Sequence, residues 1–251
     1  MSSQPQAHVE LVDMAARQDL TYAVGFMKRY DPGIQFAQQA VANFVESGEL
    51  GPLKMVGATC FLGDWLNNPG KPIESGEPPL VNDLEPTFPA FLSRDQRGIY
   101  DHFLNIYAHN VNLLHFLLPG GPMVCRSAHR GGQSFLVALR HEDVLVSLRG
   151  TPSHSHHWEE QTSLVFGGGR VEIRSATPLN RQQVAQVSIW REVAGVWSEQ
   201  RLFPPVEWAF HQQAQAFVAA IVHGSDLPTS GDRCLADVLL MEDIFRKLQE
   251  G

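Results

Sequence analysis

The sequence has no surplus of basic residues, no long apolar run and no closely spaced cysteines, and each absence excludes a class of protein. Its 251 residues include 19 Lys and Arg against 27 Asp and Glu, which gives a net charge of −8. A nucleic-acid partner is therefore not expected, because proteins that bind phosphate backbones carry a basic surface. No apolar run approaches the roughly eighteen residues that span a bilayer, so no contact with a membrane is expected.

Secretion is not expected either. The N-terminus, MSSQPQAHVE, has neither the basic region nor the apolar region of a signal peptide. The three cysteines, Cys60, Cys125 and Cys234, are far apart and odd in number, which suits reduced, buried thiols better than disulfides. Together these features predict a cytoplasmic protein.

The first part of the chain alternates between helix and strand patterns. Residues 6–18 predict a helix, and Thr21–Met27 predicts a buried strand. Asp31 and Pro32 form an N-cap and first-turn pair that opens a second helix, which Gly48 ends. A strand follows at Leu53–Leu62, and the proline-rich residues 63–94 predict a long loop with a functional or covering role.

The second half of the chain consists mainly of short strands. Seven runs with turn signals between them indicate antiparallel pairing: Met123–Arg130, Ser134–Arg140, Val144–Gly150, Thr162–Phe166, Arg170–Ala176, Val184–Arg191 and Val196–Phe203. Helices at Glu207–His223 and Asp232–Gln249 close the chain. The predicted fold class is α+β, a large, mainly antiparallel, open-faced sheet with helices on one face. The first helix and strand resemble the end of an α/β unit.

One segment, Tyr100–Gly120, predicts a helix with a wide apolar side and one narrow polar stripe. At about 100° per residue, Asp101, Asn105, His109 and Asn112 fall within roughly a quarter-turn of one another. Two interpretations are open. The stripe is the solvated face of an amphipathic helix, or it lines a cleft in which a histidine moves a proton.

Four motifs, in order, resemble the Gfo/Idh/MocA oxidoreductases, the relatives of glucose–fructose oxidoreductase and inositol dehydrogenase. They are VGFMKRYDPG with SGELGPLKMV, the histidine-bearing helix, HHWEEQTSLVFGGGRVEI, and the closing FVAAIVHGSDLPTSGDRCLADVLLMEDIFRKL. In that family an N-terminal Rossmann domain binds NAD or NADP, and a C-terminal open-faced sheet supplies the substrate side and packs between subunits. The resemblance implies an oxidoreductase of sugars or polyols that forms homo-oligomers through the open sheet face.

The family's dinucleotide-binding motifs are not found in this sequence. No G-x-G-x-x-G follows a strand, and the family's Glu-Lys-Pro motif, whose lysine is catalytic, would precede residues 6–18. We expect residues 1–30 to be a remnant of the Rossmann domain and residues 31–251 to be the C-terminal domain. Met1 is then an internal methionine of a longer reading frame. NAD or NADP is implied by the family only and is not expected to bind this chain alone.

The resemblance also assigns roles along the polar stripe. His109 matches the histidine that exchanges a proton with the substrate hydroxyl, whereas Asn105 and Asn112 stand at the family's two aspartate positions. An asparagine orients a hydroxyl or an imidazole but cannot act as a base. We expect Asn105 beside His109 in the catalytic site and Asn112 in contact with substrate. Asp101 either replaces the missing carboxylate, as a further substrate contact, or is a surface residue.

Arg29, Trp65 and the histidines of HSHHWEE have two interpretations each. Arg29 resembles an arginine near the family's domain interface and either binds an anionic ligand or pairs with Asp31. Trp65 either stacks on a sugar or anchors the loop. His154 and His156 would point the same way on a strand, but no further ligands follow at a typical spacing. No metal site is therefore expected.

Lys28 does not match the family's catalytic lysine, because the residues before it match the segment that follows that lysine.

Two functions follow from these patterns. The chain is the substrate-side domain of an NAD(P)-dependent sugar or polyol oxidoreductase that cannot transfer hydride by itself. Alternatively, it is a non-catalytic sugar-binding or oligomerisation protein of the same fold.

Overall fold

The computed structural model describes residues 4–64, 76 and 88–250. The helices are α1 (Pro5–Arg17), α2 (Pro32–Ser47), α3 (Arg94–Ile106), α4 (Ala108–Leu117), α5 (Ala209–His223) and α6 (Leu235–Glu250), with short 3₁₀ helices η1 (Met27–Tyr30) and η2 (Asp232–Cys234). The strands are β1 (Leu53–Leu62), β2 (Val124–Gly131), β3 (Ser134–His141), β4 (Val144–Pro152), β5 (Glu159–Phe166), β6 (Gly169–Arg174), β7 (Gln186–Val193) and β8 (Val196–Leu202). The predicted α+β class is confirmed.

The eight strands form one sheet in the order β2-β3-β4-β1-β5-β6-β7-β8. β1 lies parallel to β4 and antiparallel to β5, and the other neighbours pair antiparallel. The mainly antiparallel sheet was predicted, and each predicted strand of the second half forms within a few residues of its expected bounds. β1 has the predicted bounds.

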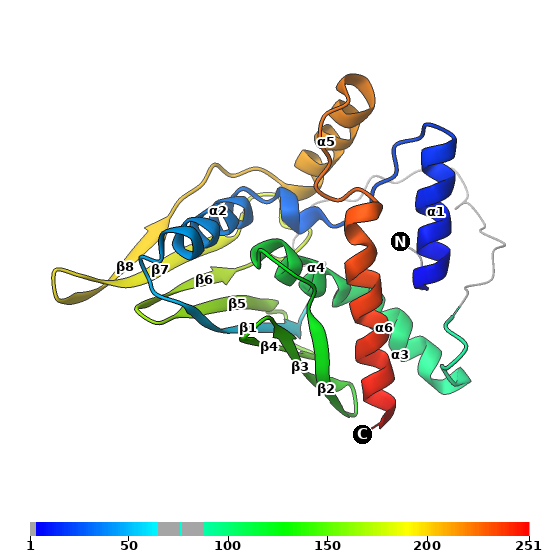
Figure 1. The fold of residues 1–251 in the computed structure, drawn as a ribbon, viewed down its shortest axis with the longest axis horizontal. Helices are drawn as coiled ribbons and strands as arrows, with labels where there is room; N and C mark the ends of the chain where they lie inside the picture. The colour runs from blue at the N-terminus through cyan, green and yellow to red at the C-terminus, as the bar shows by residue number, and fades with distance from the viewer. Residues whose placement is uncertain (1–3, 65–75, 77–87, 251) are drawn as a thin grey trace.

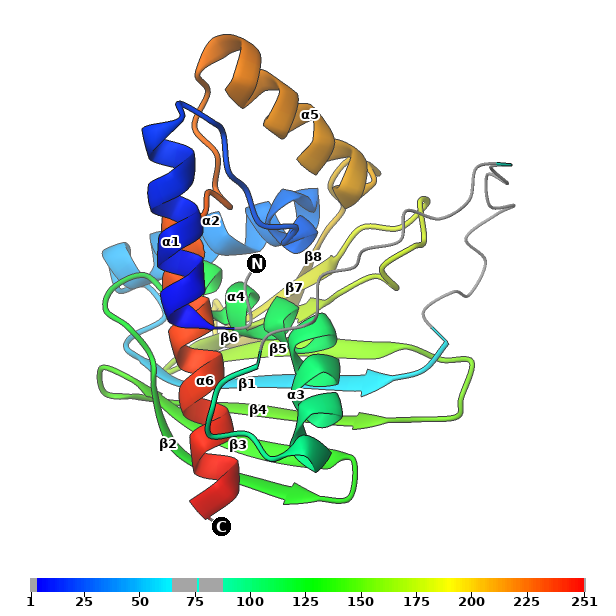
Figure 2. The same ribbon diagram turned by 90° about the vertical axis from the view of Figure 1, so that its right-hand side faces the viewer.

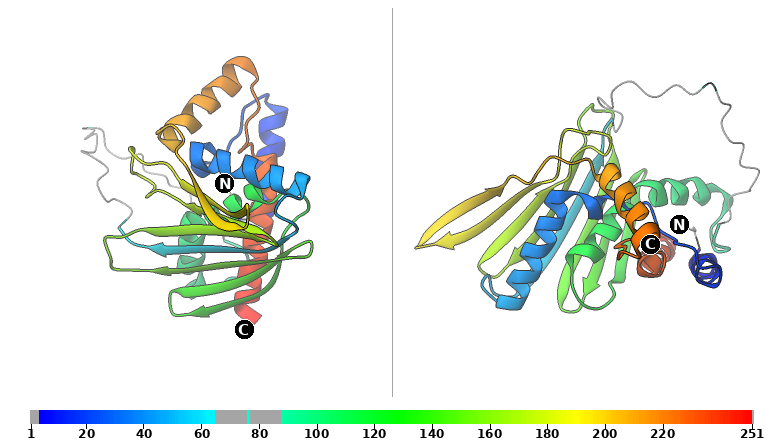
Figure 3. Two further views of the ribbon diagram at one scale, coloured as in Figure 1. Left: turned by 90° about the vertical axis from the view of Figure 1, so that its left-hand side faces the viewer. Right: turned by 90° about the horizontal axis from the view of Figure 1, so that it is seen from above.

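Side chains alternate between the two faces of this sheet. Val56, Ala58 and Cys60 of β1 are buried beneath the helices, whereas Met55 is 48% exposed on the other face. The helices lie together on one side of the sheet (Figures 1 and 3). The core therefore lies between the sheet and the helices, and the opposite face stays open, as predicted.

The start of α2 is fixed by Asp31. Its carboxylate accepts hydrogen bonds from the backbone N–H groups of Gly33 and Ile34, 2.8 and 3.2 Å away, as the N-cap signal predicts. It also accepts from the N–H of Ala185, just before β7. Burial raises the pKa of Asp31, and these hydrogen bonds oppose the rise. Asp31 thus joins the helix to the sheet.

The strand predicted at Thr21–Met27 is reduced to a single bridge between Ala23 and Ser230. The N–H of Val24 donates to the carbonyl of Thr229 at 2.8 Å, and the N–H of Gly231 donates to the carbonyl of Tyr22 at 3.0 Å. A short apolar run has the local pattern of a strand, but its backbone forms one only where a neighbouring strand pairs with it. The segment instead turns into η1 at Met27.

The helix predicted at residues 6–18 forms as α1, which lies beside α6 (Figures 1 and 2). His8, on α1, is fully buried, and its Nε2 lies 2.7 Å from the carbonyl oxygen of Gly231. The N-terminal helix therefore packs on the C-terminal part of the same chain, at Gly231 and α6.

The single helix predicted at Tyr100–Gly120 is two helices, α3 and α4, interrupted at Tyr107. α3 begins six residues earlier than predicted, at Arg94, because Ser93 and Gln96 form a capping box in which Gln96 Oε1 accepts from the N–H of Ser93 at 2.9 Å. At the interruption the Tyr107 ring packs against Phe135, with 4.4 Å between ring centroids. A side chain at Gly150 would overlap that tyrosine ring.

None of the helices in the described ranges is long and apolar enough to cross a membrane.

Candidate functional site

A cavity of about 460 Å³ opens where η1, β1, α3 and α4 meet. Each of these elements contributes a residue that can bind a ligand, namely Lys28, Cys60, Asn105 and His109. The aromatic side chains of Trp158 and Phe210 complete the wall. Two other hollows of similar volume lie along β6–β8 and around His156. Of the three, the first contains the histidine that the sequence singles out.

His109 is largely buried, and it reaches the cavity from the first turn of α4. Its Nδ1 finds no hydrogen-bond partner in the part of the chain that the structure describes. Burial, and secondarily the positive charge of Lys28, lower the pKa of His109 from 6.5 to about 3. The imidazole is therefore neutral at pH 7, and it offers a ligand one N–H donor and one lone pair.

Asn105 lines the same cavity from α3 and is exposed, so the structure brings together the two residues predicted to be catalytic. Asp101 is exposed and is not among the residues that line the cavity. Trp65 lies outside the described residues. The roles assigned to these residues remain predictions.

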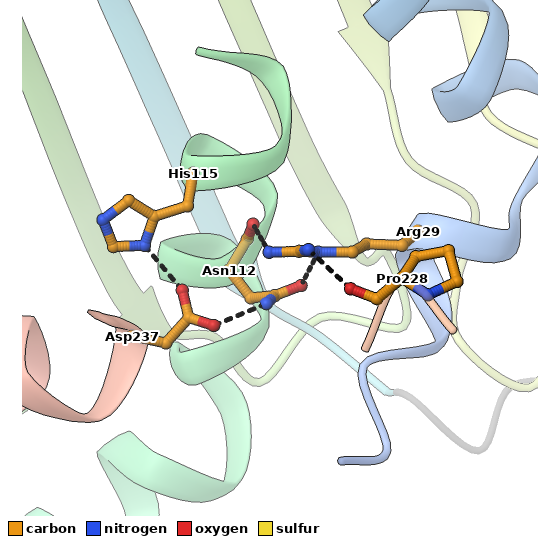
Figure 4. A network of polar contacts seen from close by, with 5 residues as sticks. All are labelled: Arg29, Asn112, His115, Pro228 and Asp237. Atoms are coloured by element: carbon orange, nitrogen blue, oxygen red, sulfur yellow. Dashed lines mark hydrogen bonds and ion pairs between the residues drawn. The ribbon is translucent and has the colours of Figure 1, made fainter. Parts of the chain in front are cut away.

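Arg29 and Asn112 meet each other in a buried network, away from the cavity lining (Figure 4). Arg29 donates from Nε to Asn112 Oδ1 at 2.8 Å and from a terminal nitrogen to the carbonyl of Pro228 at 2.9 Å. Asn112 Nδ2 donates to Asp237 Oδ2 at 2.6 Å, and Asp237 Oδ1 lies 2.6 Å from His115 Nδ1. The alternative ion pair between Arg29 and Asp31 is not formed.

This network depends on an amide at position 112. The Asn112 side chain accepts from one neighbour and donates to the other, which a carboxylate cannot do. Burial lowers the pKa of Arg29, and the charge of Asp237 opposes this shift. The two partners of Asn112 thus account for an asparagine, rather than an aspartate, at this position.

Glu160, at the start of β5, is the charged residue of this region that sequence patterns missed. It is buried and forms an ion pair with Lys28. Its oxygens also accept from Asn110 Nδ2 at 2.6 Å and from Trp158 Nε1 at 3.3 Å. The alternation of β5 contains a signal, because Glu160 falls in the same register as the buried Leu164 and Phe166.

The histidines of HSHHWEE lie in the connection before β5, which begins at Glu159, three residues before the predicted Thr162. Within the described ranges, no group of three or more His, Cys, Asp or Glu residues could hold a metal ion.

Comparison with solved structures identifies the fold. The chain is similar to UDP-N-acetylglucosamine 3-dehydrogenase from Acidithiobacillus ferrooxidans, with a TM-score of 0.68, 12% identity, and coverage of 98% of this chain and 68% of that chain. It is also similar to a 3-ketoreductase from Actinomadura kijaniata in complex with NADP, with a TM-score of 0.68, 14% identity, and coverage of 98% and 67%. These neighbours are Gfo/Idh/MocA-type oxidoreductases, and at such low identity the likeness shows the fold alone.

No family profile matches the chain. No curated protein matches it either.

Replacing Asn112 by aspartate is expected to lower the free energy of unfolding by about 2 kcal/mol, because two buried carboxylates would then face each other without a donor between them. Urea denaturation measures this change. The matched control is Asn105→Asp at the exposed edge of the cavity, which is expected to change stability by less than about 0.5 kcal/mol. Equal stabilities of the two variants would contradict the network described for Asn112.

Proposed function

We propose that this chain is the substrate-side part of a sugar or polyol oxidoreductase and that its ligand binds in the His109 cavity. The observation that carries the proposal is that His109 of α4 and Asn105 of α3 line one cavity of about 460 Å³. That volume lies within the range of small-molecule sites, and a few polar groups among apolar walls are typical of them. The fold is that of sugar-related oxidoreductases that use NAD(P), which supports this class of ligand.

The dinucleotide itself does not fit the residues that the structure describes. β1 and β4 are the parallel pair among the described strands, and β4 leads into β5 rather than through a glycine-rich turn into a helix. We therefore propose that NAD or NADP does not bind this chain alone, and we derive no hydride step for it. We also propose that residues 1–30 are a remnant of a dinucleotide-binding domain and that residues 31–251 form the C-terminal domain.

Within the cavity, His109 and Asn105 can bind and orient a ligand hydroxyl. The neutral imidazole accepts a hydrogen bond through its lone pair, and the Asn105 amide both donates and accepts. Phe26 packs edge-on against the imidazole, with 5.6 Å between ring centroids, and covers one side of it. Proton transfer from the hydroxyl requires a more basic imidazole than this one, because a base works best with a pKa near the working pH.

That weak basicity favours the second candidate, a non-catalytic sugar-binding protein of the same fold. A pKa of about 3 makes His109 a hydrogen-bonding group rather than a proton acceptor at pH 7. A carboxylate at position 105 would raise this pKa, but the chain has an asparagine there. Asn105 therefore gives His109 no charge that would increase its basicity.

Through its open sheet face, the chain is proposed to pair with a second copy. Leu145, Met55 and Val165 lie side by side on β4, β1 and β5, and all three are exposed. An apolar row of this kind is usually covered by a partner. The three free, buried cysteines fit a reducing compartment, and we propose that the protein works in the cytoplasm.

The purified chain is expected to bind D-glucose in titration calorimetry, and His109→Ala is expected to weaken binding roughly tenfold through the loss of one hydrogen bond. His129→Ala, at an exposed histidine of β2, is the matched control and should bind as the unmodified chain does. Equal affinity of the His109 variant, or no binding by the unmodified chain, would contradict the proposed site. Micromolar binding of NAD or NADP would refute the proposal about the dinucleotide.

Replacing Asn105 by aspartate is expected to raise the pKa of His109 by about 1 unit, because a carboxylate across the cavity stabilises the imidazolium. The histidine ring protons report this pKa in an NMR titration. Asn105→Gln supplies the uncharged control. An unchanged pKa would mean that the two side chains do not face each other.

Met55→Glu is expected to shift the chain from dimer or higher oligomer to monomer in light-scattering measurements, because it places a charge in the apolar row. The matched control is Leu239→Glu on α6, a residue that is also about half exposed. A monomeric unmodified chain would overturn the proposed pairing.

A further inference from the structure

Lys28 is a buried lysine in the same cavity as His109. Its side chain is only 9% exposed, and it lines the cavity from η1. The lysine charge is the second cause, after burial, of the low pKa of His109. The other titratable groups at this end of the cavity are Cys60 on β1, His102 on α3 and Glu160 on β5. A buried ammonium beside a neutral imidazole is the feature of this cavity that the sequence motifs do not explain.

Glu160 holds the Lys28 ammonium in place. Its carboxylate is fully buried, and Asn110 and Trp158 each donate a hydrogen bond to it. Asn110 donates to Oε1, the oxygen that also pairs with Lys28, and Trp158 donates to Oε2. The ion pair with Glu160 uses one of the three N–H donors of Lys28, so two donors remain for a ligand that enters the cavity.

We propose that Lys28 donates a hydrogen bond to a ligand hydroxyl beside His109, and that Glu160 cancels the lysine charge so that the cavity prefers an uncharged polyhydroxy ligand to a sugar acid. This inference rests on the proposed function and names its substrate class more narrowly. A hydroxyl oxygen accepts from the ammonium while its proton faces the lone pair of the neutral imidazole. A ligand carboxylate would lose its hydration and lie close to the carboxylate of Glu160.

A purely structural ion pair between η1 and β5 makes a different prediction. Replacing such a pair by uncharged residues is often neutral or stabilising, and it does not change which ligand binds. The relative affinity for two sugars that differ only in charge is therefore the measurement that separates the two roles.

The experiment compares D-glucose with D-glucuronate by titration calorimetry on the full chain. The unmodified protein is expected to prefer glucose. Lys28→Met is expected to bind glucose roughly tenfold more weakly, because a charged donor is lost. Glu160→Gln keeps an acceptor for Asn110 but leaves the lysine charge uncompensated, so the ratio of glucuronate to glucose affinity is expected to rise roughly tenfold or more.

Two controls keep the outcome decisive. Lys54→Met removes an exposed lysine of β1 and should leave both affinities unchanged. The double variant Lys28→Met with Glu160→Gln carries neither charge, and it should bind glucose as weakly as Lys28→Met with no gain for glucuronate. It stands in for either single variant that fails to fold.

The result that overturns this inference is an unchanged glucose affinity in Lys28→Met or in the double variant, together with His109-dependent binding. In that case the proposed function stands and the role of Lys28 falls. An unmodified chain that binds neither sugar overturns both.

Discussion

Burial of charge in a single short segment is the constraint on which the structure depends. Lys28, Arg29 and Asp31 are all buried, and each finds its partners on a different element. The lysine pairs with Glu160 on β5, the arginine bonds Asn112 on α4, and the aspartate caps α2 and holds the residue before β7. Removing three charged groups from water costs several kcal/mol each unless these partners are in place. The segment around η1 therefore joins the helices to the sheet.

The same segment decides what the cavity can do. Burial, and secondarily the lysine charge that η1 brings near His109, lower the pKa of the imidazole, so it stays neutral. A carboxylate four residues before the histidine would raise this pKa, and the chain has Asn105 instead. With these properties, the proposed site would bind a hydroxyl rather than deprotonate it. Catalysis by such a protein would need another source of negative charge near His109, because position 105 supplies none.

Local sequence patterns predicted the elements that are stabilised locally. The alternation of the seven short strands, the Asp31 cap and the Gly48 stop are each contained within a few residues, and each was found where expected. The prediction of a strand at Thr21–Met27 was wrong because a strand forms only where a neighbouring strand pairs with it. The break at Tyr107 was missed because the apolar pattern of the helix continues through it. The pairing of position 28 with Glu160 joins residues 132 apart, and no local pattern encodes a partner at that distance.

The attachment of α1 to the end of the chain has a consequence for the order of folding. The His8 ring bonds a carbonyl 223 residues later in sequence, and the backbone around Ala23 pairs with residues 229–231. During synthesis, the first helix therefore leaves the ribosome long before its binding surface exists. Contacts of such sequence separation form late and slowly, because the loop they close costs entropy that must be paid first. This segment is thus made well before the residues on which it docks, and until they are made its apolar side chains stay exposed.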